Sequence, residues 1–342
     1  MGPDRGEGVK SGSARITDVA SRARVSPATV SRVLNGSGEV SPELARRVRQ
    51  AVEELSYQPF GPARALRRQT TSVWAVIVAD IENPFFTSVV RGIEDGARQR
   101  GYRVVLCNSD EDLAKESEYI DITIAERVSG VVIAVASTRQ SNLQPLIDRS
   151  IPIVAIDRRP VGYVVDTVLA DNRLAARQAT EHLIEAGFTS IGCITGPRRL
   201  STANDRLAGY RDALVSAGRP VIDEYVLRED FREGGGYEAV TALWSKKRRP
   251  DALVVANNQM TVGALHALLD LGVKVPAEVG IVGFDDSPWA SLVRPQLSVV
   301  AQPTYEIGQT AAELLSTATH AGGPRHVLLS PKLVIRESSL RP

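Results

Sequence analysis

Short apolar runs alternate with amphipathic stretches from residue 72 to the C-terminus. The runs are apolar throughout, as expected of strands that are covered on both faces. Stretches such as Phe85–Arg100 and Leu174–Ala186, which carry apolar residues at helical spacing, separate them. This alternation predicts parallel α/β sheets, and the length of the segment favours two lobes. The apolar runs are Val73–Ala79, Val104–Cys107, Gly130–Ala136, Ile151–Ile156, Ile191–Ile194, Ala252–Ala256 and Gly280–Phe284.

Residues 15–59 follow a different pattern, that of three short helices. We expect Thr17 to cap the first helix. Ser26 and Ser41 each precede a proline, and this pair is typical of a helix start. The serine accepts a hydrogen bond from the first turn, and a proline at that turn loses no hydrogen bond. The pattern predicts a small three-helix domain that is marginally stable alone.

The remaining boundaries follow from segments that break the pattern. Residues 1–14 are rich in Gly and Ser, and we expect a disordered tail. Residues 60–71 contain Gly61 and Pro62 before a short helical stretch, which predicts a linker that folds only with a partner. Residues 72–342 form the two-lobed body.

Composition excludes several classes of protein. The chain has 342 residues, 43% hydrophobic and 24% charged, which is typical of a soluble globular protein and excludes a disordered or collagen-like chain. No apolar run reaches the roughly 18 residues of a membrane span. Residues 1–13 have no apolar core, so we expect no secretory signal. Cys107 and Cys193 lie in apolar runs and are expected to be buried free thiols.

The net charge of +1 hides an asymmetry. Residues 1–70 hold 12 Lys and Arg against 7 Asp and Glu, whereas the remainder holds 29 against 33. A basic head on a mildly acidic body is consistent with binding to a polyanion, although a solubilising surface has the same composition.

The segment from Ile16 to Gly36 has the spacing of a helix-turn-helix. Ala20 is small where two helices cross, and Val25 and Val30 fill the space between them. The second helix of such a unit lies in the major groove. The hydroxyl groups of that helix can donate hydrogen bonds to phosphates, and Arg32 can bind a base or a phosphate. The alternative is a three-helix bundle that contacts proteins.

The same residues carry a family resemblance. "ITDVASRARVSPATVSRVLNGSGEV", together with the stretch through "GPARALRR", resembles the DNA-binding head and hinge of lactose-repressor-type bacterial transcription regulators. "NDRLAGYRDAL", "VVANNQMTVGAL" and "VGFDDSPWA" extend the resemblance over about residues 15–338. It implies a helix-turn-helix head and a body like that of periplasmic binding proteins. It also implies a homodimeric repressor that binds palindromic operator DNA in the bacterial cytoplasm, at the nucleoid, and responds to a small-molecule effector.

The resemblance implies a set of DNA contacts. Pro27, Ala28 and Arg32 stand where family members read major-groove bases. Pro27 and Ala28 offer only apolar contact, which leaves Arg32 as the strongest direct reader. Leu66 occupies the place of a leucine that wedges into a base step in the minor groove. The full set is Thr17, Ser26, Pro27, Ala28, Thr29, Ser31, Arg32, Asn35, Ala63 and Leu66.

Polar residues stand just after the predicted strands of the body. Asp157 and Arg158 follow Ile156, and Asp285 follows Phe284. Ligands of parallel sheets bind outside the carboxyl ends of the strands. Each of these residues could instead be a helix cap or a turn residue.

The body is also similar to ribose-type periplasmic sugar receptors. The similarity implies an effector site that suits a pentose, and the Asp157–Arg158 pair favours a ribose-like ligand. A purine, a phosphosugar or another sugar is the alternative. The implied contacts are Asn83, Phe85, Phe86, Asp157, Arg158, Arg206, Phe231, Asn257, Asp285 and Gln302.

Two further classes of function compete with this hypothesis. An enzyme is disfavoured because the four histidines lack metal-ligand spacing and the chain has no Walker loop, dinucleotide fingerprint or nucleophile elbow. We therefore expect no catalytic residue, metal or cofactor. A sugar receptor that binds no DNA would require export. The helical stretches Phe85–Arg100 and Lys115–Arg127 are candidates for the dimer face, and no leucine heptad for a tetramer follows the body.

Overall fold

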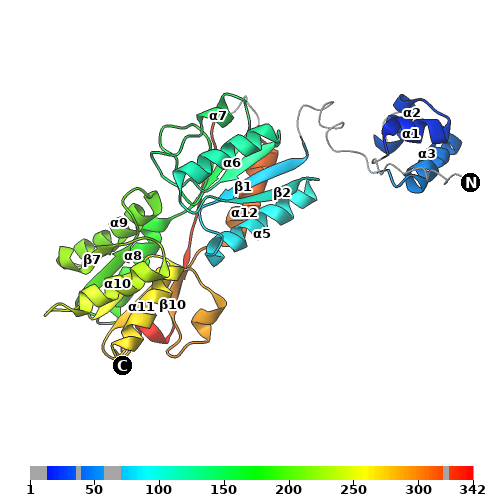
Figure 1. The fold of residues 1–342 in the computed structure, drawn as a ribbon. Coiled ribbons are helices and arrows are strands. Elements are labelled where there is room, and N and C mark those ends of the chain that lie inside the picture. Colours follow the sequence, from blue (N-terminus) through cyan, green and yellow to red (C-terminus); the bar gives the residue numbers. More distant parts are fainter. Residues whose placement is uncertain (1–13, 36–39, 58–70, 319–322, 342) are drawn as a thin grey trace, which may run out of the picture. The chain divides into compact units, whose positions relative to one another are not determined.

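The computed structural model describes residues 14–35, 40–57, 71–318 and 323–341. Its contacts divide the chain into two compact units, a head of residues 1–71 and a body of residues 72–342. Figure 1 draws both units. Ala63 and Leu66, the predicted hinge contacts, lie outside the described residues.

The head contains the three predicted helices, α1 (Ile16–Ala23), α2 (Pro27–Asn35) and α3 (Pro42–Glu54). Ser26 Oγ accepts a hydrogen bond from Thr29 N at 3.2 Å, and Ser41 Oγ accepts one from Leu44 N at 3.4 Å, so both predicted serine caps are confirmed. The cap predicted at Thr17 is wrong.

The first helix begins one residue before Thr17. Its N-cap is Arg15, whose backbone N–H donates to the Asp18 carboxylate at 2.7 Å. An aspartate in the first turn satisfies a free N–H as well as a capping hydroxyl does, and it is also favourably placed in the helix dipole.

A small apolar core holds the head together. Its fully covered residues come from all three helices. Arg24 has φ 52° and ends α1 in the left-handed conformation that the turn requires. Arg22 then pairs with Glu54 at 2.6 Å and ties α1 to α3. The buried core residues are Val19, Ala20, Ala23, Val30, Val48 and Ala51.

Sheet A and its helices form the first lobe of the body, the N-lobe. The strand order is β11-β5-β4-β3-β1-β2, and every pairing in the sheet is parallel. Alternate residues of β1 belong to different apolar clusters, such as Val76 with α5 and α12 and Ile77 with α6 and α7, so helices cover both faces. The strands are β1 (Val73–Val78), β2 (Arg103–Asn108), β3 (Gly130–Ile133), β4 (Ile153–Ile156), β5 (Asp166–Ala170) and β11 (His326–Leu329). The helices are α5 (Pro84–Gln99), α6 (Leu113–Ala125), α7 (Gln144–Ile147) and α12 (Thr304–Ser316).

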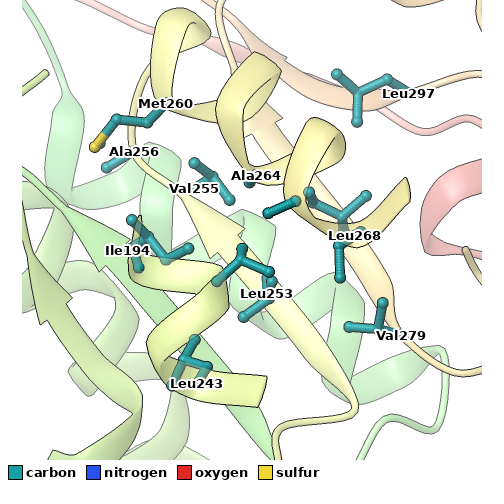
Figure 2. Close-up of a cluster of buried hydrophobic side chains, with 14 of the residues drawn as sticks. Ile194, Leu243, Leu253, Val255, Ala256, Met260, Ala264, Leu268, Val279 and Leu297 are labelled. Atoms are coloured by element: carbon teal, nitrogen blue, oxygen red, sulfur yellow. The ribbon is translucent and has the colours of Figure 1, made fainter. Parts of the chain in front are cut away.

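Sheet B forms the second lobe, the C-lobe, in the order β12-β10-β9-β8-β6-β7. Its pairings are parallel except that β12 runs antiparallel to β10. Figure 2 shows one face of its core, where Leu253 and Val255 lie against Ala264 and Leu268 of α11. The strands are β6 (Ile191–Thr195), β7 (Val226–Arg228), β8 (Ala252–Val255), β9 (Gly280–Phe284), β10 (Ser298–Ala301) and β12 (Lys332–Val334). The α-helices are α8 (Asn172–Glu185), α9 (Ser201–Ser216), α10 (Glu233–Trp244) and α11 (Asn258–Asp270), with 3₁₀ turns at Asp223–Tyr225, Pro288–Ser291 and Glu337–Ser339.

The chain passes between the lobes after β5, after β10 and after β11. Helix α12 therefore returns to the N-lobe and packs against α5, as Figure 1 shows. Glycines permit this close approach: a Cβ on Gly92 would lie 2.3 Å from Tyr305 O, and one on Gly308 would lie 2.1 Å from Val89 O. The two lobes are thus each assembled from separate parts of the sequence.

The structure also bears on the two cysteines and on membrane-spanning helices. Cys107 and Cys193 are buried free thiols, as expected, and burial raises the pKa of Cys193 to about 12. Among the described helices, none is both long and apolar enough to span a membrane.

A buried polar network fixes the C-terminal segment to the C-lobe. His182 Nε2 lies 2.7 Å from Ser339 Oγ, which lies 2.6 Å from Ser298 Oγ. Burial lowers the pKa of His182, and the nearby Glu185 carboxylate offsets only part of this effect. The folded protein therefore holds this imidazole neutral.

We expect this histidine to destabilise the protein in acid. The unfolded chain protonates its histidine near pH 6.5, above the folded pKa, so this contribution to stability is complete above about pH 6.5 and is lost as the pH falls below it. Urea unfolding at pH 7.5 and pH 5.5 measures the loss, which should be smaller in His182→Gln than in the unmodified chain. His266→Gln, at an exposed histidine, is the control. An equal loss in all three proteins would exclude His182 as the sensor.

Candidate functional site

The ten predicted effector residues of the body line one small cavity at the junction of the two lobes. The space between the protein atoms there, including the part open to solvent, is about 280 Å³. The N-lobe supplies the loop after β1, the start of α5 and the end of β4, and the C-lobe supplies α9 and the segments after β7, β8, β9 and β10. The lining residues are Asn83, Phe85, Phe86, Asp157, Arg158, Thr202, Arg206, Phe231, Asn257, Asp285 and Gln302.

Aromatic rings from both lobes form the apolar walls of the cavity. Phe85 and Phe86 are buried and meet edge to face, with ring centroids 5.0 Å apart and an interplanar angle of 87°. Phe231 comes from the C-lobe and packs over Gly196, where a Cβ would lie 2.4 Å from its ring. Such faces suit the apolar side of a flat or ring-shaped ligand.

Two carboxylates and two guanidinium groups face one another in the cavity. Asp157, Arg158, Arg206 and Asp285 are each at least nine-tenths buried. Burial raises the pKa of Asp157 and of Asp285, although the neighbouring guanidinium groups oppose the shift. Burial also lowers the pKa of Arg206. The formal charges balance, so the site offers charged hydrogen-bonding groups without a net charge for a ligand to neutralise.

Arg206 is fixed before any ligand arrives. Its Nε donates to Asn172 Oδ1 at 2.7 Å, its Nη1 donates to the Ala256 carbonyl, and its guanidinium lies 4.3 Å from the centroid of the Phe284 ring. These contacts hold a long side chain in one conformation, which reduces the entropy that binding would otherwise lose.

The backbone is strained at the two aspartates. Asp157 has φ 61° and Asp285 has φ 71°, in the left-handed region that non-glycine residues seldom adopt. This conformation costs about 1 to 2 kcal/mol per residue, and such strain is concentrated at functional sites. Here it directs both carboxylates to the cavity.

Three buried polar atoms of the cavity have no hydrogen-bond partner among the described residues. They are Thr202 Oγ1, Gln302 Oε1 and Arg158 Nε, of which only Arg158 Nε has a charged neighbour, Asp157 Oδ2 at 3.1 Å. Gln302 is oriented by its other amide atom, Nε2, which donates to Asp285 Oδ1 at 2.6 Å. A buried unpaired polar group costs about 1 to 3 kcal/mol, so a ligand that pairs with these atoms gains by doing so.

Two predicted contacts also act as helix caps. Asn83 Oδ1 accepts from Phe85 N at 3.0 Å. Asn257 Oδ1 accepts from Met260 N at 2.8 Å, and its Nδ2 donates to Phe231 O at 2.9 Å. Both amides therefore shape the cavity wall, which was the alternative interpretation of these positions.

Sequence reasoning missed Thr202. It lies in the first turn of α9, four residues before Arg206, so the two side chains share one face of that helix. That spacing from an arginine already predicted to bind the effector is the signal that would have identified it.

The head presents most of its predicted DNA contacts at the surface. Thr17, Ser26, Pro27, Ala28 and Arg32 are exposed, and Thr29 and Ser31 are half-buried. Ser26 Oγ and Thr29 Oγ1 lie 2.9 Å apart, so each can reorient to bond a phosphate. Asn35 ends α2, and its backbone alone is described.

Comparison with known proteins matches both units. Residues 15–59 match the model of bacterial regulatory proteins of the lacI family, and residues 180–339 match a periplasmic binding protein-like domain. The ribose operon repressor of Halalkalibacterium halodurans is 36% identical over 300 residues, 88% of this chain and 88% of that protein. The lac repressor dimer bound to operator and an anti-inducer has a TM-score of 0.84 at 27% identity, covering 96% of this chain and 99% of that one. The transcriptional regulator CelR in complex with cellobiose has a TM-score of 0.72 at 31% identity, covering 95% and 99%.

The chain belongs to the lacI family of bacterial regulatory proteins. It is a DNA-binding transcriptional regulator with a helix-turn-helix head and a two-lobed effector-binding body. Its sheets are parallel except at the β12 edge, a small departure from the predicted all-parallel lobes.

Proposed function

We propose that the chain is a repressor that binds a palindromic operator as a homodimer, and that a pentose held in the interlobe cavity sets its operator affinity. The observation that carries the effector assignment is the pair of unpartnered atoms, Thr202 Oγ1 and Gln302 Oε1, in a cavity of balanced charge. Hydroxyl groups both donate and accept, so a sugar satisfies these atoms and the carboxylates together.

The chemistry of the cavity favours a neutral polyhydroxylated ring over a phosphosugar. A phosphate brings about two negative charges to a site where Asp157 and Asp285 already balance Arg158 and Arg206. Burying that excess charge without a partner is costly. The similarity to ribose operon repressors supports a pentose, and a purine is the competing ligand that the experiment below tests.

An exposed apolar edge of the N-lobe supports the homodimer. Strand β2 is the last strand of its sheet, and Val105 and Leu106 on it are 52% and 39% exposed. Ile122 on the neighbouring helix α6 is 52% exposed. Unpaired strand edges with apolar side chains are favourable sites for association. We propose that a second copy covers this edge and also the adjoining surface of α5.

We propose that the two activities are linked through lobe closure. The ligand has a higher affinity for one closure angle, and the operator has a higher affinity for one spacing of the two heads. Coupling between such sites typically amounts to about 1 to 3 kcal/mol. The head contacts the major groove through α2, with the hinge residues Ala63 and Leu66 proposed for the minor groove. This scheme assigns the chain no catalytic residue, and it places the protein on nucleoid DNA in the bacterial cytoplasm.

A selection experiment tests both halves of the proposal. The full chain is used to select duplexes from a random pool at fixed ionic strength, with and without D-ribose, because protein–DNA affinity depends steeply on salt. We expect a palindrome to be enriched and its affinity to change with ribose. Calorimetry against ribose, other pentoses and hypoxanthine identifies the ligand class. Tight purine binding with no sugar binding would overturn the effector assignment, and enrichment of no palindrome would overturn the regulatory one.

Replacing Thr202 by valine tests the cavity directly. Valine keeps the shape of threonine but removes Oγ1, the atom that a sugar hydroxyl would satisfy. We expect D-ribose affinity to fall about 5- to 10-fold, as for one hydrogen bond of roughly 1 kcal/mol, while the ligand-free protein becomes no less stable. Calorimetry and thermal unfolding measure the two quantities. Ser216→Ala, at an exposed position of the same helix, is the control. Unchanged ribose affinity in Thr202→Val would remove this residue from the site.

A further inference from the structure

We propose that Glu111, which lies outside the cavity lining, is a positioning residue: it fixes the effector-binding Arg158 and ties that arginine to the opposite lobe through Arg199. This inference rests on the proposed function of the cavity. It assigns a role to a loop, between β2 and α6, that neither the sequence motifs nor the cavity lining singled out.

Glu111 holds two arginines with its two carboxylate oxygens. Arg158 Nη2 donates to Oε1 at 2.5 Å, and Arg199 Nη2 donates to Oε2 at 2.8 Å. Arg158 is 3% exposed and Glu111 13%, so little water competes for their hydrogen bond. Arg158 also donates through Nη1 to the Val135 carbonyl at 3.2 Å. Both Nη atoms of the guanidinium are thus held by groups outside the cavity lining, and Nε lies beside Asp157 Oδ2 without a hydrogen bond.

The second arginine comes from the other lobe. Arg199 lies in the segment between β6 and α9, which belongs to the C-lobe, whereas Glu111 and Arg158 belong to the N-lobe. This segment and the start of α9 make further interlobe bonds: Thr138 N donates to Arg199 O at 3.1 Å, and Ser201 N donates to Thr138 Oγ1 at 2.9 Å. Thr202 follows directly in the chain. Glu111 therefore connects a ligand-contacting side chain to the surface along which the lobes meet.

The backbone at this loop is held in an unusual conformation. Asp110 and Glu111 have φ values of 52° and 57°, both in the left-handed region. Asp157, next to Arg158, shares this feature. Two consecutive non-glycine residues seldom adopt it, and the surrounding contacts must maintain it. Here it directs the Glu111 carboxylate toward Arg158 and Arg199.

The Glu111 carboxylate therefore takes part both in lobe closure and in positioning the ligand-binding Arg158. When the lobes separate, Arg199 moves away with the C-lobe and Glu111 keeps only Arg158. When they close, the charge-assisted bond to Arg199 forms and Arg158 is fixed in place. A second interlobe pair, Asp80 with Arg232 at 2.9 Å, also favours closure but contacts none of the charged cavity residues. Glu111 should therefore affect which sugar is bound, and Asp80 only how tightly.

The test compares variants of the full chain that each remove one charged side-chain group. Glu111→Gln and Arg199→Met remove the interlobe bond, and Asp80→Asn removes the other one. Asp110→Asn is the matched control, since Asp110 lies in the same loop but pairs with Lys115 and Asn108 of its own lobe. Asparagine also tolerates the left-handed backbone there. Calorimetry measures affinity for D-ribose, D-xylose and L-arabinose, and thermal unfolding reports on folding.

We expect Glu111→Gln to weaken ribose binding about 10- to 100-fold and to reduce the preference for ribose over the other two pentoses. Adding Arg199→Met to Glu111→Gln should have little further effect, because both remove the same contact. Asp80→Asn should weaken the binding of all three sugars by the same factor. If the Glu111→Gln protein bound all three sugars with the same affinities as the Asp110→Asn protein, the proposal would be overturned.

A readout without ligand separates this inference from the proposed function. Spin labels at Asp148→Cys, directly after α7, and Ser216→Cys of α9, both exposed, report the distance between the lobes when labelled chain is diluted with unlabelled chain. If no pentose binds the unmodified chain, the effector assignment fails, and the distance distribution still decides this inference. A closed population that decreases in Glu111→Gln and Arg199→Met, but not in Asp110→Asn, supports it. Identical distributions in all variants would overturn it.

Discussion

Replacing Arg32 by alanine is expected to weaken binding to the selected operator about 100-fold or more. Arg32 is exposed on α2, and its neighbours Pro27 and Ala28 offer no side-chain hydrogen bonds. It is therefore the side chain of this helix best able to read a base edge through two hydrogen bonds, a contact worth about 1 to 3 kcal/mol. A dimer on a palindrome makes that contact twice, which roughly doubles the loss of free energy.

Fluorescence anisotropy with the operator and with a scrambled duplex, at one ionic strength, measures this effect. Arg49→Ala is the control, because it removes the same charge from an exposed position of α3. If Arg32 contacts a base, Arg32→Ala should lower affinity for the operator far more than affinity for the scrambled duplex. If Arg32→Ala weakened both duplexes equally and reduced the salt dependence, Arg32 would be a phosphate contact and the operator would be read by other residues.

The second large effect is expected at Arg206. Arg206→Met should lower ribose affinity by at least about 100-fold and also lower the melting temperature of the ligand-free protein. The change removes a guanidinium that is 4% exposed and leaves Asp157 and Asp285 with Arg158 as their remaining buried cation in the cavity. Breaking a buried charge network by removing one partner costs about 3 to 5 kcal/mol. The pKa values of both aspartates should rise further, since Arg206 lowers each of them in the unmodified protein.

Calorimetry and thermal unfolding of the same preparations separate the two consequences. Arg211→Met is the matched control, as Arg211 lies on the same helix and pairs with Asp223 at the exposed surface. It should leave both quantities unchanged. Ribose binding by Arg206→Met at the affinity of the unmodified chain would mean that this guanidinium is structural only, and the effector would have to be held by the other cavity residues.

Several parts of the fold could be predicted because their signals are local. The serine–proline pairs at Ser26 and Ser41 start helices by satisfying the N–H groups of their own first turn. The cap at Thr17 failed because Arg15 and Asp18 satisfy the same turn. The apolar runs of the body became β1, β2, β3, β4, β6, β8 and β9. All of these except the exposed edge strand β2 are buried, as expected of apolar strands covered on both faces.

Three short strands could not be predicted, because their local signal is weak. Strands β7, β11 and β12 are only three or four residues long and half-buried or exposed, so each carries at most a short apolar run. Their pairing depends on neighbours far away in the chain, such as β11 with β5 and β12 with β10. The passage of the chain back to the N-lobe at α12 follows from the same long-range contacts.

The sequence by itself determined the three-helix head, the alternation of strands and helices, and the polar residues at strand ends, because capping, periodicity and strand termini are properties of neighbouring residues. Only the tertiary structure decided that those polar residues meet in one charge-balanced cavity, that Thr202 joins them, and that Glu111 reaches Arg158 and Arg199 from a separate loop. Burial and partnership are set by which distant elements pack together, and these are the quantities that determine pKa, unpaired hydrogen-bonding capacity and interlobe contact.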